Sequence, residues 1–107
     1  IMMTSGQDLG SMRKELAYAA SKGAISSMTE SLSDALIDQG ITVNTVNPGP
    51  VDTGYATSAE HEETRHRFPQ REWGQPEDPA RLIAWLCSDD ARWVTGQVIN
   101  SEGGFRR

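Results

Sequence analysis

The sequence has few of the features expected of a secreted, membrane-spanning or nucleic-acid-binding protein. Cys87 is its one cysteine, so no internal disulfide can form, and we expect a reducing, cytoplasmic setting. No apolar run approaches the roughly 20 residues that cross a bilayer. The few residues before Thr4 are expected to be too short for a secretory signal. With 15 acidic and 10 basic side chains the net charge is −5, which argues against a nucleic-acid partner.

Length and composition are those of one small domain. The 107 residues are 36% hydrophobic and 23% charged, which suits a folded domain with one core, expected to span residues 1–107. We expect Cys87 to pack as a small hydrophobe. His61 and His66 are five residues apart and lie on different faces of a helix. They make no metal pair, and both are expected to be solvated surface side chains.

Hydrophobic periodicity predicts alternating strands and helices. A long helix over 15–39 has one internal glycine and no proline, and Gly40 ends it because glycine adopts a left-handed conformation without strain. Its apolar stripe recurs at spacings of three and four: Ala17, Ala20, Ala24, Ile25, Met28, Leu32, Ala35 and Leu36. Another helix opens at Pro76 and ends at Ser88. Short strands are predicted at Ile1–Met3, Ile41–Val46 and Gln97–Asn100.

The order of strand, helix and strand predicts a crossover that pairs the first two strands in parallel. We therefore expect an α/β fold with three parallel strands layered with helices. Residues 54–75, with a short helix around Ser58–Arg67, are interpreted either as a mobile flap over a site or as an ordinary surface loop. Asn47-Pro48-Gly49-Pro50 breaks the second strand at its carboxyl end, where open α/β sheets bind ligands. Trp85 and Trp93 are expected to anchor the core or an interface.

Tyr18 and Lys22 form the pair with the clearest chemical meaning. Four residues apart on the long helix, they lie one turn above each other on one face. The positive charge of Lys22 favours the phenolate, so that Tyr18 can exchange a proton with a carbonyl or alcohol oxygen near neutral pH. Ser5 lies thirteen residues upstream in a polar turn. Such a tyrosine–lysine pair is common on exposed helices, so its meaning depends on the surrounding motifs.

Five short motifs follow one another in order along the chain. They are Ser5 thirteen residues before Tyr18, Tyr18-Ala-Ala-Ser-Lys22-Gly, Ile41-Thr-Val-Asn-Thr-Val-Asn-Pro-Gly-Pro-Val-Asp-Thr53, Arg71-Glu-Trp-Gly-Gln-Pro-Glu-Asp-Pro-Ala80 and Thr95-Gly-Gln-Val-Ile-Asn-Ser-Glu-Gly-Gly104. Together they resemble the carboxyl-terminal half of a short-chain dehydrogenase/reductase, over essentially the whole chain. The nearest subgroups are the 3-oxoacyl-carrier-protein reductases and glucose-dehydrogenase-like members. The resemblance implies the carboxyl-terminal portion of a Rossmann-type doubly wound fold.

The resemblance also implies a reaction, the transfer of hydride between NAD or NADP and a carbonyl or secondary alcohol of a small molecule. Tyr18 would be the general acid/base on the reacting oxygen, and Ser5 would hydrogen-bond that oxygen. Lys22 would promote ionisation of the tyrosine and hold the nicotinamide ribose. No metal is implied.

Two further groups of residues take their roles from the same resemblance. The loop that receives the nicotinamide side of the cofactor is matched by Pro48, Gly49, Val51 and Thr53. The substrate pocket is expected to be lined by Gly6, Gln7, Tyr55 and Trp73.

The chain also departs from the family. The glycine-rich dinucleotide fingerprint should follow the family's first strand, and nothing here supplies it. Gly6-Gln-Asp-Leu-Gly10 is the nearest run, but Met12 stands where the next glycine belongs. The residue that selects NAD or NADP and the family's catalytic asparagine have no counterpart either. We therefore expect the acid/base apparatus without the pyrophosphate cradle, and poor cofactor binding by these residues alone.

Two alternatives stay open at this point. One is an inactive, truncated remnant held in a homo-oligomer through the helix 15–39 and the edge of the opening strand. The other is a cofactor-free hydrolase, because Ser11-Met-Arg-Lys14 has the Ser-x-x-Lys spacing and Tyr18 lies one turn beyond Lys14.

Overall fold

The computed structural model describes residues 1–107, and its centre is a three-stranded parallel sheet in the order β1-β2-β3. The strands are β1 (Met2–Met3), β2 (Thr45–Asn47) and β3 (Val98–Asn100). The helices are α1 (Leu16–Leu36), α2 (Ser58–His66) and α3 (Glu77–Leu86). Short 3-10 turns cover Gly6–Asp8, Ile37–Gln39 and Asp89–Ala91. The predicted fold class, three parallel strands layered with helices, is confirmed.

β2 is the central strand and pairs on both sides. Thr45 lies opposite Met2 of β1 and opposite Val98 of β3. The strand predicted over Ile41–Val46 is confirmed at Thr45 and Val46, but its bounds are wrong, because regular pairing covers Thr45–Asn47. The β-branched composition of residues 41–44 favours a strand, but the backbone bonds there are single ones, from Met2 to Asn44 and from Gly96 to Val43, so composition alone does not decide the boundary.

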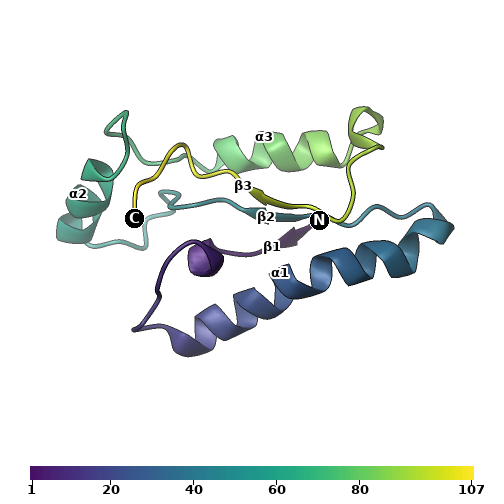
Figure 1. The fold of residues 1–107 in the computed structure, drawn as a ribbon. Helices are drawn as coiled ribbons and strands as arrows, with labels where there is room; N and C mark the ends of the chain where they lie inside the picture. The colour runs from purple at the N-terminus through teal and green to yellow at the C-terminus, as the bar shows by residue number, and fades with distance from the viewer.

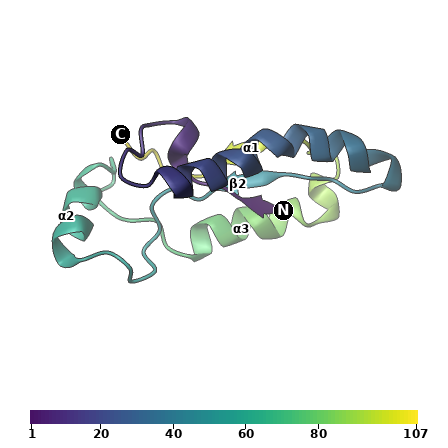
Figure 2. The same ribbon diagram turned by 90° about the horizontal axis from the view of Figure 1, so that it is seen from below.

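α1 and α3 cover opposite faces of the sheet (Figure 1). In the view from below, α1 again runs along the sheet with α3 on its other side (Figure 2). In both views the C-terminus, α2 and the turn after β1 lie at the same end of the molecule. This is the end at which β1 and β2 finish, so the loops that follow the strands are brought together there.

The face of α1 that meets the sheet is polar. Thr29 and Ser33 are 0% and 6% exposed and are the buried residues of this helix. The hydroxyls of Thr29 and Thr45 are hydrogen-bonded at 2.6 Å, and those of Ser33 and Thr95 at 2.7 Å. Burial of a hydroxyl is tolerated when it has such a partner. The helix is therefore held to the sheet by paired hydroxyls. Past Gln39 the chain turns at Gly40, whose φ is 73°.

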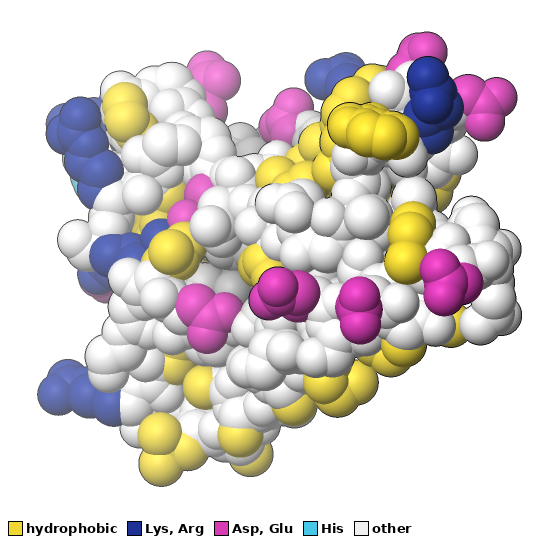
Figure 3. Space-filling model, turned by 45° about the vertical axis from the view of Figure 1, so that its right-hand side comes forward, with side chains coloured by type: hydrophobic (Ala, Val, Ile, Leu, Met, Phe, Trp, Pro, Cys, Tyr) yellow, Lys and Arg dark blue, Asp and Glu magenta, His cyan; other side chains and the backbone are white.

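Much of the stripe predicted for this helix lies on its outer face. Five members are exposed, namely Ala17, Ala20, Ala24, Met28 and Ala35, while Ile25, Leu32 and Leu36 are half-buried. Figure 3 shows apolar side chains along the lower part of the molecule. A stripe of small residues at helical spacing does not by itself show which side of the helix meets the sheet. In this helix the side that meets the sheet carries the hydroxyls of Thr29 and Ser33. No helix in the structure is both long enough and apolar enough to span a membrane.

α3 supplies the apolar core on the opposite face. Leu86 packs with Val46 and Ala91, and all three are at most 4% exposed. Half-buried hydrophobic residues surround them: Met3, Leu82, Ile83, Val94 and Ile99. The prediction that Cys87 is packed is wrong, because it is exposed at the C-cap of α3. Trp85 and Trp93 are also exposed, at 44% and 90%, so neither anchors the core of this chain.

Candidate active site

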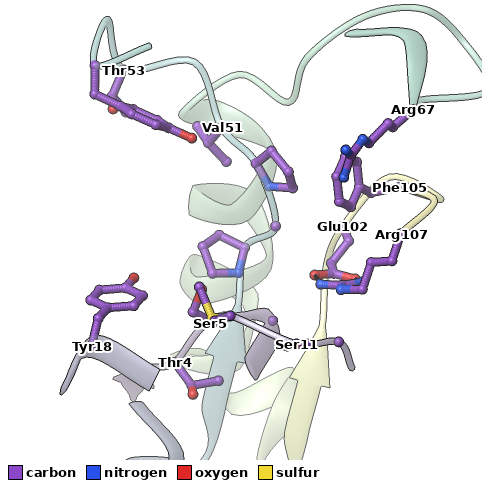
Figure 4. A pocket seen from close by; sticks show the side chains of 17 residues that line it. Thr4, Ser5, Ser11, Tyr18, Val51, Thr53, Arg67, Glu102, Phe105 and Arg107 are labelled. Atoms are coloured by element: carbon purple, nitrogen blue, oxygen red, sulfur yellow. Dashed lines mark hydrogen bonds and ion pairs between the residues drawn. The ribbon is translucent and has the colours of Figure 1, made fainter. Parts of the chain in front are cut away.

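Two of the three predicted catalytic residues, Ser5 and Tyr18, line a cavity of about 650 Å³ at the carboxyl ends of the strands, whereas Lys22 lies behind Tyr18 and is not part of the lining. The cavity is lined by the turn after β1, the loop after β2 and the tail after β3 (Figure 4). Its lining includes Ser5, Gly6 and Tyr18 on one side, and Pro48, Gly49, Val51, Thr53 and Tyr55 from the loop after β2. This is the position at which open α/β sheets bind ligands.

The turn that carries Ser5 is tied to α1 by reciprocal hydrogen bonds. The buried Thr4 donates its hydroxyl proton to the backbone oxygen of Lys22 at 2.9 Å. Lys22 in turn donates from Nζ to the backbone oxygen of Met3 at 3.1 Å. The amide of Ser5 donates to Oε1 of Gln7 at 3.2 Å. These bonds fix the separation of β1 from α1, and so they fix Ser5 relative to the helix that carries Lys22.

Tyr18 stands near the start of α1 with its side chain partly open to solvent. Its residue exposure is 45%, and Nζ of Lys22 lies 5.7 Å from the centre of its ring. Figure 4 shows the phenol standing beside Ser5 at the edge of the cavity. Neither the Ser5 nor the Tyr18 hydroxyl is hydrogen-bonded within the chain. Both hydroxyls are therefore free to bond a third atom placed in the cavity.

The loop after β2 is shaped by Asn47 and Gly49. Asn47 is 1% exposed, and its Oδ1 accepts a hydrogen bond from the Gly49 amide at 3.0 Å. Gly49 has φ of 67°, and a Cβ at this position would lie 2.8 Å from Cα of Glu102. Glycine is required here for both reasons. The loop can therefore pass close to the tail after β3 while Pro48 and Val51 border the cavity.

The opposite wall is formed by an ion pair that the sequence did not indicate. Arg107 donates two hydrogen bonds to the carboxylate of Glu102, at 2.5 and 2.7 Å. The same carboxylate accepts a bond from Nδ2 of Asn47 at 2.8 Å. The Arg107 hydrogen bonds, helped by that of Asn47, hold the pKa of Glu102 below the usual range of a glutamate. Figure 4 shows this pair facing Ser5 and Tyr18 across the cavity.

Arg107 also lies against the turn that carries Ser5. A Cβ on Gly6 would lie 2.0 Å from its guanidinium, and a Cβ on Gly10 would lie 2.7 Å from its side chain. The two glycines thus leave the space that Arg107 occupies. Hydrogen bonds join Asn47, at the end of β2, to Glu102 and Glu102 to Arg107, and Arg107 lies close to the turn that carries Ser5.

The four residues expected at the substrate pocket do not all reach the cavity. Gly6 and Tyr55 line it. Gln7 is turned away, and its side chain bonds Thr4 and Asp8 at 3.1 and 2.8 Å. Trp73 is 7% exposed and borders a second hollow, on the other side of the loop after β2.

The sequence interpretation missed several residues that line the cavity. The charged ones are Arg67, Glu102 and Arg107, and the uncharged ones are Thr4, Gly10, Met12, Pro50 and Phe105. Ser11, which the sequence indicated only for the hydrolase alternative, lines it as well. Glu102 falls inside one of the five motifs, which is the signal that could have drawn attention to it. Arg107 and Arg67 belong to no motif, and only their position in space brings them to the site.

The two histidines differ in their surroundings. His66 is 57% exposed, as expected of a surface side chain. The same expectation holds only in part for His61, whose side chain is 37% exposed but whose ring also stacks on Trp73 with centres 4.7 Å apart and bonds Asp52 at 3.1 Å. An amphipathic spacing rule cannot detect these partners, which come from other segments of the chain.

Comparison with known proteins agrees with this geometry. Residues 1–106 match the family described as Enoyl-(Acyl carrier protein) reductase. The chain is 57% identical to the uncharacterized oxidoreductase YjdA of Bacillus subtilis, over 107 residues that make up all of this chain and 43% of that protein. It is 38% identical to glucose 1-dehydrogenase 2 of Bacillus subtilis, with 82% of this chain and 36% of that protein covered.

Solved structures show the same relationship. The angucycline C-6 ketoreductase LanV with bound NADP superposes with a TM-score of 0.88 and 33% identity, covering 95% of this chain and 41% of that one. 4-Hydroxyisoleucine dehydrogenase complexed with NADH gives a TM-score of 0.84 and 28% identity, covering 95% and 44%. The chain therefore belongs to the short-chain dehydrogenase/reductase family. It spans less than half the length of the relatives that it matches.

Proposed function

We propose that this chain carries the proton-transfer end of a nicotinamide-dependent short-chain dehydrogenase/reductase, acting on a carbonyl or secondary alcohol of a small molecule. The observation that supports this most is the placement of two unbonded hydroxyls, those of Ser5 and Tyr18, at one cavity beside Lys22. Residues 1–107 would form one domain of the active protein, and the remainder of a longer protein would supply the pyrophosphate site.

In this proposal Tyr18 Oη gives its proton to the substrate oxygen during reduction and takes it back during oxidation. The Ser5 hydroxyl donates a hydrogen bond to the same oxygen, which stabilises the charge that develops there. The positive charge of Lys22 stabilises the phenolate that forms when the proton leaves. The bound nicotinamide supplies the hydride.

The residues present suit a nicotinamide cofactor. Lys22 uses one of its three protons on the oxygen of Met3, which leaves two for ribose hydroxyls. Gly49 lacks a side chain where the loop after β2 borders the cavity, and Thr53 adds a hydroxyl on the same loop. Solved relatives are described with NADP and with NADH, so both are candidates for this chain.

A chimera tests the proposal. The chain would replace the matching 107 residues of YjdA, to which it is 57% identical, and NADH and NADPH binding and ketone reduction would be measured. We expect saturable binding, about tenfold weaker in Lys22→Met, as is typical for loss of a charged hydrogen bond. A folded chimera that binds neither nucleotide at millimolar concentration would contradict the proposal.

We further propose that a second copy of the chain packs on the exposed face of α1 and near the free edge of β1. Leu16 is 72% exposed and Met28 50% exposed on this helix. β1 lies at the edge of the sheet, where unpaired backbone groups favour added partners. Light scattering should show a dimer or larger species, and a monomer at all concentrations would contradict this.

The hydrolase alternative receives no support from the geometry. Ser11 and Lys14 are both exposed, and no hydrogen bond joins them. A serine nucleophile needs its base within hydrogen-bond reach.

A further inference from the structure

Asp52 and His61 connect the loop after β2 to α2. Nε2 of His61 donates to Oδ2 of Asp52 at 3.1 Å, and Oδ1 of Asp52 accepts from the Gly54 amide at 3.1 Å. The Asp52 amide donates to the oxygen of Gly74 at 2.9 Å. One aspartate thus joins three segments, and its bond to His61 is the one that reaches α2.

Trp73 forms the other side of this connection. Its indole is 7% exposed and lies parallel to the His61 ring, at 9° between planes and 4.7 Å between centres. Its Nε1 donates to the backbone oxygen of His61 at 2.9 Å. Tyr55 meets the indole edge-on at 6.0 Å. The imidazole of His61 is therefore held between a carboxylate and the face of an indole.

Both neighbours of this imidazole fix its position. The carboxylate of Asp52 accepts its Nε2 proton, and the indole of Trp73 covers one face of the ring. The Gly54 amide and then His61 keep the pKa of Asp52 below the usual range of an aspartate, so this carboxylate stays charged at neutral pH.

The remaining charges around His61 are largely paired or balanced. Glu62 and Arg65, on the same helix, form an ion pair with each other. The hollow that His61 and Trp73 border also contains Arg71, Glu72, Asp78 and Glu102. Of these, Glu102 is paired with Arg107 and Asp78 with Arg81, and Arg71 is hydrogen-bonded to His66.

The connection ends next to the cavity. Asp52 lies between Val51 and Thr53, and both of these line the cavity, as does Tyr55. We propose that His61 is a positioning residue that clamps α2 to the loop after β2 and so holds Thr53 and Tyr55 at the cavity wall. The clamp consists of its hydrogen bond to Asp52 and its stacking on Trp73. Its effect on turnover rests on the proposed function, whereas its formation does not.

Tryptophan fluorescence of the chain tests the clamp without any assay of activity. Trp85→Phe and Trp93→Phe, at two exposed positions, leave Trp73 as the sole tryptophan. Because the imidazole covers one face of an indole that is 7% exposed, His61→Gln should open Trp73 to water. Its emission maximum should shift to longer wavelength and acrylamide should quench it more strongly. Neither change should appear in His66→Gln, the matched control on the same helix. An emission maximum and acrylamide quenching in His61→Gln equal to those of the parent would overturn the proposal.

Kinetics of the YjdA chimera test the effect on the site. His61→Gln should raise KM about fivefold with kcat nearly unchanged, the size of effect expected for one lost hydrogen bond. His66→Gln should leave both constants unchanged. Asp52→Asn should give the same pattern as His61→Gln and serves as the second variant if His61→Gln misfolds. An unchanged KM in both His61→Gln and Asp52→Asn would overturn the positioning role. Loss of cofactor binding in the parent chimera would instead count against the proposed function.

Discussion

The two faces of the sheet are built in different ways. Against α1 the contact is made by hydroxyls, with Thr29 bonded to Thr45 and Ser33 to Thr95. Against α3 it is made by hydrophobic side chains around Leu86. Directional hydrogen bonds fix the position of a helix more narrowly than apolar contact does, whereas apolar burial contributes more to stability.

The difference matters because the proposed catalytic residues belong to the α1 side. Tyr18 and Lys22 lie on α1. Thr4, just after β1, donates to the backbone oxygen of Lys22, and Lys22 donates to the backbone oxygen of Met3 in β1. A site that must hold a hydroxyl within hydrogen-bond distance of a substrate atom benefits from a directional contact. We therefore expect changes on the α1 side to affect chemistry, and changes on the α3 side to affect stability.

The largest effect is expected at Tyr18. In the YjdA chimera, Tyr18→Phe should lower kcat about a thousandfold, within the usual range for a lost general acid/base. The free energy of unfolding should hardly change, because the hydroxyl is unbonded and the residue is 45% exposed. Steady-state kinetics and urea unfolding measure the two quantities. If Tyr18→Phe kept the kcat of the parent, the proposed role of the α1 side in chemistry would be contradicted.

The next largest effect is expected on the α3 side, where a change at Leu86 should lower stability. Leu86→Ala should lower the free energy of unfolding by about 3 kcal/mol, because Leu86 is 4% exposed and its truncation leaves a cavity in the core. Trp93→Phe is the matched control on an exposed position and should change it by less than about 0.5 kcal/mol. Urea denaturation followed by circular dichroism gives both values. Equal effects for the two variants would show that α3 does not carry the core.

A smaller effect is expected between α1 and the sheet. Thr29→Val should lower the free energy of unfolding by about 2 kcal/mol, because the buried hydroxyl of Thr45 loses its partner. The double variant Thr29→Val/Thr45→Val should recover much of this loss, since no buried hydroxyl is then unpaired. If the double variant lost as much as the sum of the single ones, the contact would owe its strength to something other than the hydroxyl pair.

The smallest effect is expected from the ion pair of Glu102 and Arg107. The pKa of Glu102 is lowered in the folded chain, mainly by its bonds from Arg107. The stabilisation is therefore present above about pH 4.3, the ordinary glutamate value, and is lost as the pH falls further. Thermal unfolding between pH 7 and pH 3 should show a smaller loss of Tm in Glu102→Gln than in the parent. The same loss in both would show that this pair contributes nothing.

The sequence predicted those features that depend on local spacing. Ser5, Tyr18 and Pro48 lie in short motifs at the ends of predicted elements, and the structure places all three at one cavity. Contacts between distant segments were not predictable, because no local spacing relates Glu102 to Asn47, whose side chain bonds it from the end of β2. The orientation of α1 was not predictable either, since helical spacing shows that faces exist but does not choose which one meets the sheet.

The central claim is that Tyr18 delivers a proton in a hydride transfer at this cavity, and isotope transfer tests it most directly. The YjdA chimera would be given NADPH and NADH deuterated at C4 on either face, together with a carbonyl substrate that it reduces. We predict that deuterium appears on the carbinol carbon of the product from one face of the nicotinamide, and that Tyr18→Phe nearly abolishes this transfer. Product formed without deuterium from either face, or equal transfer in Tyr18→Phe, would contradict the account.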